Sequence, residues 1–471
     1  MLPIAACVAL FVSSPASAGA ISAPAVTAAP DSGAATPDVA AVYYNPAAIA
    51  AVPGFSAMLD VQAALIRIDA TATRNGGLDP NSGQPYDVAT ARVMVPVGLL
   101  GATWQVIPDR LTLGFAANDP FVGGGDYTST ESGDVPPYTG HQRYHGINTQ
   151  IITASFTPAV GVTVIDGLHV GAGASYYLDH IYVLQASDPM GTEGVPLDQI
   201  GLDVPSDPYG LDTYLEGNAT GHHWGWNAGL FFDRFARAQV GLSYWSGGTF
   251  HASGDGSVDV PALLTQGETR LVVPAKVEVS MPLAPVARLY LASQLNERWR
   301  VGLGMDWELW NLRCGGEEGD IDIKLTNEAG GAIGPDDGVS IEIATQQYAP
   351  RRLWNAMNGV ATVGLQANDK LWLGGRLGVN QYAVPDYALS ATNLDFANVG
   401  VVLGGRYKVG KVTLGLAYSK FFLLTREITD SAWNLQDGNA RFSPVTPYKA
   451  SANGTYSGAA DALGLRIGVD L

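Results

Sequence analysis

Large apolar residues occupy every second position along much of the chain. In the segment 301–310, one set comprises Val301, Leu303, Met305, Trp307 and Leu309, and the set between them comprises Gly302, Gly304, Asp306, Glu308 and Trp310. The same alternation runs through 168–177, 371–380 and 463–471. Successive side chains of a β-strand point to opposite faces, so this period predicts strands with one large apolar face.

The second face of these segments is unusual for a soluble protein, because it is mostly glycine with an occasional charge. The solvent face of a soluble β-sandwich normally carries Lys, Glu and Thr. A transmembrane β-barrel instead turns its apolar face to lipid and fills its lumen with the other set, with aromatic girdles near the strand ends. Tyr176, Tyr244, Trp307 and Tyr418 lie on the apolar face and fit such girdles. We predict an all-β transmembrane antiparallel barrel; a periplasmic all-β domain is the alternative.

The number and spacing of the alternating segments agree with a single closed barrel. Candidate strands cover residues 55–70, 88–106, 110–122, 147–165, 168–184, 220–233, 236–252, 270–294, 298–312, 355–367, 370–382, 397–409, 411–426 and 460–471. That is about fourteen, and single-chain bacterial barrels have an even number of strands. Long connections at 123–146, 185–219, 313–354 and 427–459 alternate with short ones. We predict that residues 55–471 form the barrel, with periplasmic turns and extracellular loops.

The third predicted strand contains residues that weaken strand pairing. Its sequence is LTLGFAANDPFVGGG, in which the disruptive positions are Gly114, Asn118, Pro120, Gly123 and Gly124. Proline has no N–H group to donate to a ladder, and glycine removes side-chain packing from a strand. We expect a bulge or a gap in the barrel wall at this strand.

Two segments precede the predicted barrel. Residues 1–18 contain an apolar run followed by Ala16 and Ala18 in the A-x-A arrangement that signal peptidase cleaves, which predicts an export signal. Residues 19–54 are rich in small residues and include AVYYNPAAIAAVPG, where Pro46 suits the first position of a helical turn. A barrel of about fourteen strands is wide enough to leak unless its lumen is filled. We interpret residues 19–54 as a lumen plug; the alternative is a disordered periplasmic linker.

Composition and motifs argue against several classes of protein. The formal net charge of -18 disfavours binding to nucleic-acid phosphate. Removal of the signal leaves only Cys314, so we expect no intramolecular disulfide. His141 and His145 lie in a Gly/Pro-rich connection, and His222 and His223 are adjacent on opposite strand faces, so neither pair predicts a metal site. Because no nucleophile motif or dinucleotide fingerprint occurs, we predict no enzymatic activity, no cofactor and no metal.

Several segments resemble the FadL family of outer-membrane transporters for long-chain fatty acids and other hydrophobic compounds. The segment DVAAVYYNPAAIAAV is similar to the signature of that family's N-terminal hatch. The family's order and spacing are kept by GHHWGWNAGLFFDRFARAQVGLSYWSG, VVPAKVEVSMPL, RWRVGLGMDWELW, LWLGGRLGVNQYAVPDYAL and NVGVVLGGRYKVGKVTLGLAYSKFF. The resemblance implies a fourteen-stranded barrel with a hatch in its lumen, located in the outer membrane of a Gram-negative bacterium.

The resemblance also implies a route for the ligand. Hydrophobic molecules enter from the extracellular loops, reach an internal pocket and leave sideways through a gap at a kink in the third strand. Asn45, Pro46 and Ala47 would form the hatch turn next to that kink. Burying an acyl chain gains about 0.8 kcal/mol per methylene, so passive diffusion through an apolar lumen needs no energy coupling.

A fatty acid also carries a carboxylate, and burying a carboxylate is costly unless a cation or hydrogen-bond donors meet it. Arg376 and Arg466 lie on the predicted inward faces and are the candidate partners. The alternative is a structural charge network in the lumen that joins these arginines to Asp306 and Glu308. A neutral hydrocarbon would need no such arginine.

Passive uptake of long-chain fatty acids is the predicted function, with aromatic or aliphatic hydrocarbons as alternative substrates. Two other classes stay open, a surface adhesin or structural barrel and an outer-membrane lipid-modifying enzyme. The expected partners are the hydrophobic ligand and the surrounding outer-membrane lipid and lipopolysaccharide, and no nucleic acid. A closed barrel gives no reason to require oligomers, so we expect a monomer.

Overall fold

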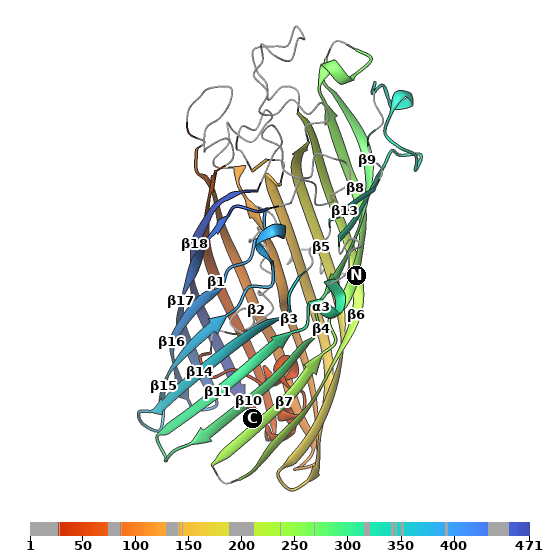
Figure 1. The fold of residues 1–471 in the computed structure, drawn as a ribbon. Coiled ribbons are helices and arrows are strands. Elements are labelled where there is room, and N and C mark those ends of the chain that lie inside the picture. The colour runs from red at the N-terminus through yellow and green to blue at the C-terminus, as the bar shows by residue number, and fades with distance from the viewer. Residues whose placement is uncertain are drawn as a thin grey trace.

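The computed structural model describes residue 27 and residues 29–471, apart from 74–84, 86, 129–139, 141, 144, 188–211, 236, 268, 315–320, 341–342, 344–345, 350–352, 391–393 and 432–451. Nearly all the regular structure is β-strand, arranged as a closed barrel (Figure 1). The predicted export signal lies outside the described residues. Among the described residues, no helix reaches the length and apolar character that crossing a membrane would need.

The strands form one antiparallel sheet that closes on itself. β1 (Phe55–Ala72) pairs with β2 (Ala89–Ile107) on one edge and with β18 (Gly454–Asp470) on the other. Within the described ranges, eighteen strand segments make a closed barrel of 14 strands, because two barrel strands are broken in two and one hairpin extends outward. The predicted all-β barrel is therefore confirmed.

The two broken strands lie next to each other. β7 (Ala238–Trp245) and β8 (Gly248–Val260) pair in succession with β6 (Thr213–Phe235), and β10 (Val286–Gln294) and β9 (Leu271–Leu283) pair with β7 and β8. The first break contains Gly247, whose φ of 61° suits glycine. The second contains Pro285, which has no N–H group to donate to a ladder.

The remaining elements complete the barrel and its rim. The strands are β3 (Leu111–Asp126), β4 (Asn148–Ile165), β5 (Leu168–Ser187), β11 (Trp299–Glu308), β12 (Ile321–Thr326), β13 (Gln346–Ala349), β14 (Ala356–Gln366), β15 (Leu371–Asn380), β16 (Asn398–Val409) and β17 (Val412–Ile428). The short helices are α1 (Ala41–Tyr44), η3 (Ala48–Ala51), η7 (Ala262–Leu264), α3 (Asn311–Cys314), η8 (Pro335–Asp337) and η9 (Asp386–Ala388). The β12–β13 hairpin extends from β9, since β11 pairs directly with β14.

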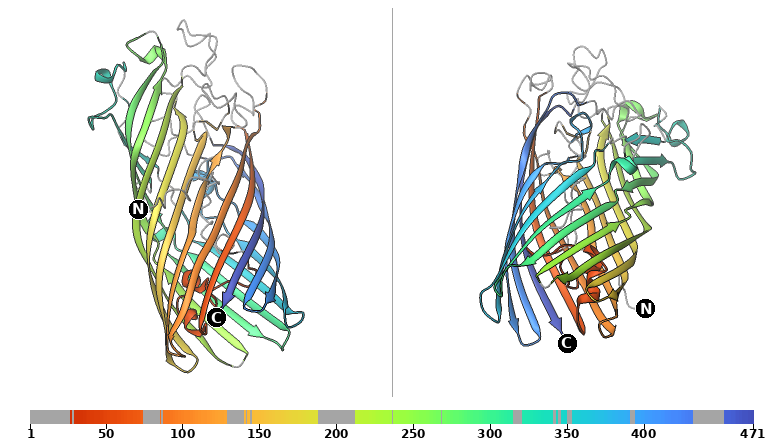
Figure 2. Two further views of the ribbon diagram at one scale, coloured as in Figure 1. Left: turned by 180° about the vertical axis from the view of Figure 1, so that it is seen from behind. Right: turned by 60° about the horizontal axis from the view of Figure 1, so that its bottom comes forward.

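The two ends of the barrel differ. Short turns such as 108–110, 166–167 and 410–411 lie at one end, where the start of β1 also meets the end of β18. We call this the short-turn end, and it is at the bottom of Figure 1. The long connections lie at the opposite end (Figure 2). β5 and β6, with 20 and 23 residues, rise above β11 and β15, with 10 residues each, so the wall is uneven in height.

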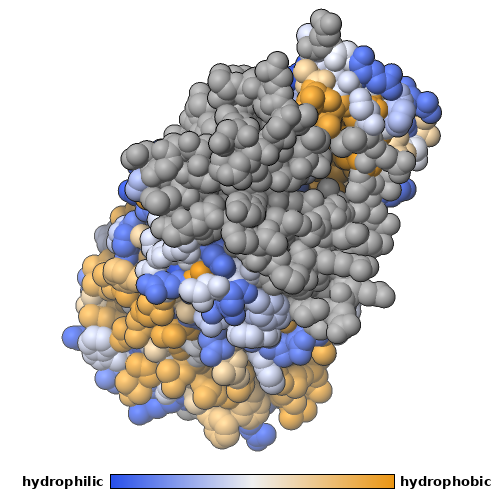
Figure 3. Space-filling model, turned by 45° about the horizontal axis from the view of Figure 1, so that its top comes forward, coloured by the Kyte–Doolittle hydropathy of each residue, from blue (hydrophilic) through white to orange (hydrophobic). Residues whose placement is uncertain are grey.

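The outer surface carries the apolar face predicted from the alternation. Leu303 on β11 is 62% exposed and Leu65 on β1 is 59% exposed, whereas Asp306 and Arg376 on the other face are buried. The visible lower side of the barrel is largely apolar in Figure 3. The faces read from the sequence are therefore confirmed for β11 and β15, and β1 follows the same pattern.

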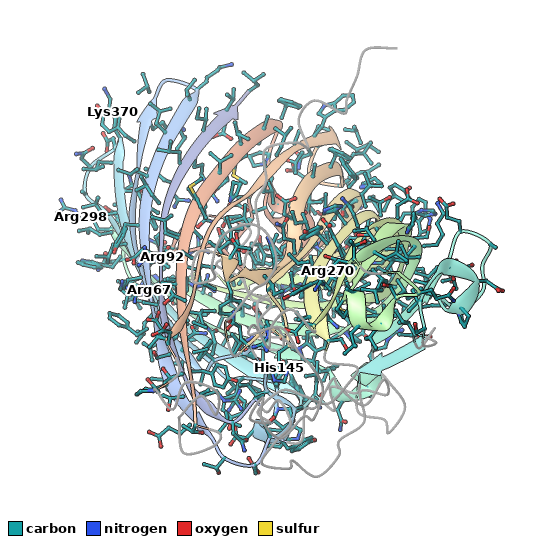
Figure 4. All side chains as sticks on the ribbon, turned by 90° about the horizontal axis from the view of Figure 1, so that it is seen from above. Arg67, Arg92, His145, Arg270, Arg298 and Lys370 are labelled. Atoms are coloured by element: carbon teal, nitrogen blue, oxygen red, sulfur yellow. The ribbon has the colours of Figure 1, made fainter. Side chains whose placement is uncertain are left out.

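Charged side chains border this apolar surface. Arg67 on β1 lies opposite Arg92 on β2. The two arginines are two residues farther from the short-turn end than the exposed pair Leu65 and Met94. Figure 4 shows the two arginines near one another on neighbouring strands, and it shows Arg298 and Lys370, which belong to short turns, elsewhere on the barrel. An apolar outer band with charged side chains at both of its edges is what a lipid-facing barrel surface requires.

The interior has two layers. In the part near the long connections, buried apolar side chains from many strands form one large cluster that includes Phe121, Ile151, Tyr177, Trp245 and Phe250. Nearer the short-turn end, a second cluster is built around the segment that precedes β1, including Val39, Val42, Tyr44 and Ile49. A large apolar cluster thus lines the upper part of the lumen, and the N-terminal chain fills the lower part.

Candidate functional site

The N-terminal segment, residues 29–54, lies inside the barrel near the short-turn end (Figure 2). It contains the single turns α1 and η3, and η3 contacts strands β3 to β6. The wall makes room for it with glycines. A Cβ atom at Gly171 would lie 2.4 Å from the backbone of Pro46 and Ala47, and one at Gly161 would lie 2.7 Å from Ile49. The segment and the wall therefore fit one another closely.

Asn45 connects the segment to itself and to the wall. Its Nδ2 donates to the carbonyl oxygens of Ala34 at 2.8 Å and of Leu230 on β6 at 2.9 Å, and its Oδ1 accepts from Ala47 N at 3.2 Å. The side chain packs over Gly229, where a Cβ atom would lie 2.0 Å from Oδ1. Asn45, Ala34 and Ala47 are buried and the bond to Leu230 is partly buried, so the hydrogen bonds within the segment would be costly to leave unmade.

Further polar contacts come from inward-facing residues of the wall. Asn227 Nδ2 donates to the carbonyl of Val42 at 2.8 Å, and Ser243 Oγ donates to that of Tyr44 at 2.5 Å. The sequence analysis missed both residues. Their alternation inside β6 and β7 assigns them to the lumen face, but only the fold gives them a partner in the segment.

Two aspartates of the segment form ion pairs with the wall. Asp31 Oδ2 lies 2.7 Å from Arg406 Nη2, and Asp38 Oδ2 lies 3.3 Å from Arg466 Nη1. Burial alone would raise the pKa of Asp31, but the charges of Arg406, Arg466 and Arg300 lower it below its usual value. Burial raises the pKa of Asp38, and the charge of Arg466 opposes that increase only in part.

Arg466 is therefore committed to partners within the protein. Besides Asp38, its Nε donates to the fully buried Asp60 of β1 at 2.8 Å. The alternative network that would join it to Asp306 and Glu308 is wrong for this arginine. Asp306 lies 3.8 Å from Arg288, and Glu308 accepts from Trp310 Nε1 and Asn358 Nδ2 at 2.8 Å each. β18 neighbours β1 in the closed barrel, and this closure brings Asp60 to Arg466.

Arg376 differs from Arg466. It is buried, and its Nη1 donates to the carbonyl of Ser32 at 2.9 Å. Its Nε and Nη2 atoms are buried without a hydrogen-bond partner, and no carboxylate forms an ion pair with it among the residues that the structure describes. A buried guanidinium without a counter-charge is costly, so the atoms left over are suited to an anionic group.

The wall is interrupted between β2 and β3. Their ladder runs from Ile107↔Leu111 to Leu99↔Asn118 and then ends, although β2 begins at Ala89 and β3 continues to Asp126. On the other edge of β3, the ladder with β4 has a register shift between Asn118 and Phe121. We call this unpaired stretch the β2–β3 interruption. It begins directly above Leu99 and Ala116, which pack against the N-terminal segment.

The predicted disruptive residues do not all belong to this interruption. Asn118 is the last residue of β3 that pairs with β2, and Pro120 lies within the register shift between β3 and β4. Gly123 and Gly124 follow the register shift on β3. Gly114 instead pairs with Thr103 below the interruption, and a Cβ atom there would lie 2.8 Å from Val42. The space at Gly114 accommodates the N-terminal segment.

Apolar side chains cover the interruption from within. Val93, Val95 and Val97 on the inward face of β2 form a buried cluster, and Val122 of β3 packs against them. The side chain of Val122 on β3 therefore contacts β2 across the stretch where the two backbones do not pair. Side-chain packing holds the two strands together there, and such packing can separate without breaking a ladder.

One buried polar group stands out in the upper lumen. His223 Nδ1 lies 2.6 Å from Asp179 Oδ2, and Asp179 Oδ1 accepts from Thr153 Oγ1 at 2.8 Å. The ring of His223 stacks on Tyr177 at 4.3 Å. The pair thus belongs to a hydrogen-bonded lining rather than to a metal site, and no cluster of three metal-ligating side chains occurs within the described ranges. His141 lies outside those ranges.

Comparison with known proteins assigns the family. Residues 9–312 match the family described as "Outer membrane protein transport protein (OMPP1/FadL/TodX)". The chain belongs to this family. No curated protein sequence matches the chain. Members of the FadL/TodX family are outer-membrane transporters of hydrophobic compounds, channels rather than enzymes, and the barrel described above fits the outer membrane of a Gram-negative bacterium.

Solved structures share the fold of this FadL/TodX family member at low sequence identity. A FadL homologue of Pseudomonas aeruginosa is 17% identical, with 98% of this chain and 99% of that chain covered and a TM-score of 0.71. The toluene transporter TodX of P. putida is 16% identical, with 92% and 94% covered and a TM-score of 0.60. The toluene transporter TbuX of Ralstonia pickettii is 14% identical, with 93% and 96% covered and a TM-score of 0.57.

Proposed function

We propose that the protein takes up long-chain fatty acids across the outer membrane by passive diffusion, with the β2–β3 interruption as a lateral exit. The observation that carries this proposal is the position of the interruption. It opens the wall of an apolar upper lumen directly above the segment that fills the lower lumen. A ligand descending from the extracellular end meets the segment and has a route sideways into the bilayer.

Burial energies favour such a route. Each methylene of an acyl chain gains about 0.8 kcal/mol on leaving water, so a long chain is strongly driven into an apolar lumen. The lipid interior offers the same environment, so passage through the wall costs the chain little. Water would be the costly destination, and the N-terminal segment blocks it.

The carboxylate of a fatty acid needs a partner in this lumen, and Arg376 supports the acid as substrate. Its Nε and Nη2 atoms have no hydrogen-bond partner among the described residues, while Arg466 is occupied by Asp60 and Asp38. We therefore assign the carboxylate to Arg376 and give Arg466 a structural role. Asn45, Pro46 and Ala47 act as the hatch turn that holds the segment below the exit.

The test is uptake of labelled oleate and labelled toluene by cells that lack their own outer-membrane fatty acid transporter. Cells carrying the chain should take up oleate faster than cells without it. Arg376→Met should lower oleate uptake about tenfold or more and leave toluene uptake unchanged, because only the acid needs the guanidinium. Arg298→Met, in an exposed turn, is the matched control. Equal oleate uptake by Arg376→Met and the unsubstituted chain would remove Arg376 from the route.

Uptake of aromatic hydrocarbons is the second candidate. Two structural relatives are described as toluene transporters, and the upper lumen is lined mainly by apolar side chains. This candidate predicts toluene uptake that depends on the chain, without oleate uptake. Arg376 would then be a structural residue, and Arg376→Met would change transport of neither compound.

A further inference from the structure

A cavity lies at the short-turn end, between the N-terminal segment and the barrel wall. Its volume is about 460 Å³, which is within the usual range for small-molecule sites. One side is formed by the segment, through Pro37, Asp38, Val39, Val52 and Pro53. The other side is formed by the barrel wall at β1, β16, β17 and β18.

The space exists because the wall carries small residues there. Gly468 on β18 lines the cavity, and the nearest atom to a Cβ built on it is 3.8 Å away. Thr413 and Ser56 line it from the two neighbouring strands. These small residues leave space between the segment and the wall, beside the longer side chains of Met58 and Arg466 that also line the cavity.

The lining combines apolar and charged side chains. Val39, Val52 and Met58 contribute apolar surface, and Arg406, Lys408 and Arg466 contribute positive charge. Two carboxylates also line the cavity: Asp38 is paired with Arg466, and Asp470 accepts from Ser56 Oγ at 2.8 Å. Arg406 and Arg466 are paired with aspartates of the segment, but Lys408 forms no ion pair among the described residues. Lys408 is exposed, so it lies at the outer rim of the cavity.

We infer that this cavity binds a single-chain amphipathic anion at the periplasmic face, with the acyl chain against Val39, Val52 and Met58 and the anionic group at Lys408. An apolar surface beside an unpaired cation is complementary to a molecule that combines a hydrocarbon chain and a negative head. The inference rests on the proposed function only for the identity of that anion as a fatty carboxylate. It gives the protein a periplasm-facing site in addition to the lateral exit.

The experiment uses the full chain in lipid nanodiscs and a photoreactive oleate with a diazirine in mid-chain. Cross-linked peptides are mapped by mass spectrometry, so labelling beside the cavity, at residues 37–39 and 52–58, is separated from labelling in the upper lumen. The alcohol that carries the same diazirine is the neutral probe. The acid should label the cavity at least tenfold more than the alcohol does.

Two variants test the site. Gly468→Leu fills the cavity, and Gly359→Leu places the same side chain on the exposed face of β14, where no atom lies within 4 Å of a built Cβ. Gly468→Leu should abolish cavity labelling and keep upper-lumen labelling, whereas Gly359→Leu should alter neither. Lys408→Gln should lower cavity labelling by the acid, and Lys411→Gln in the adjacent turn should not.

Each result decides one assignment. Cavity labelling that persists in Gly468→Leu, or equal labelling by acid and alcohol, would overturn the periplasmic site. Labelling of the upper lumen without any labelling of the cavity would also overturn it and would leave the proposed function intact. If cavity labelling occurs while the chain restores no oleate uptake in cells, the site stands and the proposed function fails.

Discussion

Asn45→Ala should loosen the N-terminal segment without unfolding the barrel. The substitution leaves the buried carbonyl of Ala34 and the buried N–H of Ala47 without the partner that Asn45 provides, and it removes a hydrogen bond to the part-buried carbonyl of Leu230 on β6. Each of the two unsatisfied groups costs about 1–3 kcal/mol and the lost bond to Leu230 adds about 0.5–1.5 kcal/mol, so the segment's docked state should lose about 3 kcal/mol or more. A loss of that size corresponds to roughly a hundredfold change in an opening equilibrium. The barrel ladders do not involve Asn45 and should be unaffected.

Hydrogen exchange measures this opening directly. Amides of residues 41–52 should exchange about a hundredfold faster in Asn45→Ala, while amides of β5 and β6 keep their rates. Ion conductance of the barrel in planar bilayers should rise as well, because the segment fills the lower lumen. Asn368→Ala is the matched control, since Asn368 Oδ1 accepts backbone hydrogen bonds in an exposed turn far from the segment. Unchanged exchange in residues 41–52, or equal acceleration in the segment and the strands, would refute the reasoning.

Three further predictions follow from buried charges and from the interruption. Arg376→Met should raise barrel stability to urea by about 1–4 kcal/mol while it lowers oleate uptake, because it removes a buried charge that has no counter-charge among the described residues; lower stability would contradict this account. Burial raises the pKa of Asp395, between β15 and β16, to about 6, so its stabilising contribution is full below pH 4 and is lost as the pH rises through 6. The protection factors of residues 381–390 and 394–397, which correct for the intrinsic pH dependence of exchange, should therefore fall between pH 4 and 7 in the unsubstituted chain, and much less in Asp395→Asn. Val122→Ala should weaken the packing across the β2–β3 interruption and raise uptake, and reduced uptake with normal barrel assembly would argue against a lateral exit.

The local sequence determined the strands and their faces. Alternation in 301–310 and 371–380 assigns Asp306 and Arg376 to the lumen, and the structure confirms this because the two faces of a strand meet lipid and lumen respectively. The weakened pairing near Asn118 and Pro120 was likewise readable, since proline lacks the N–H group that a ladder needs. These features depend on the backbone geometry of a few neighbouring residues.

The tertiary structure decided which side chains meet. Asp60 and Arg466 are 406 residues apart, and they pair because the first and last strands close the barrel. In the sequence, Gly114 and Gly123 look equally able to weaken strand pairing. In the structure, Gly114 lies below the interruption and makes room for Val42 of the N-terminal segment. Arg376 and Arg466 look alike in the sequence, and only the fold gives one of them two carboxylates and leaves the other without one among the described residues. Alternation fixes the face of a side chain, whereas its partner depends on strand register and on the path of a segment that shares no ladder with the wall.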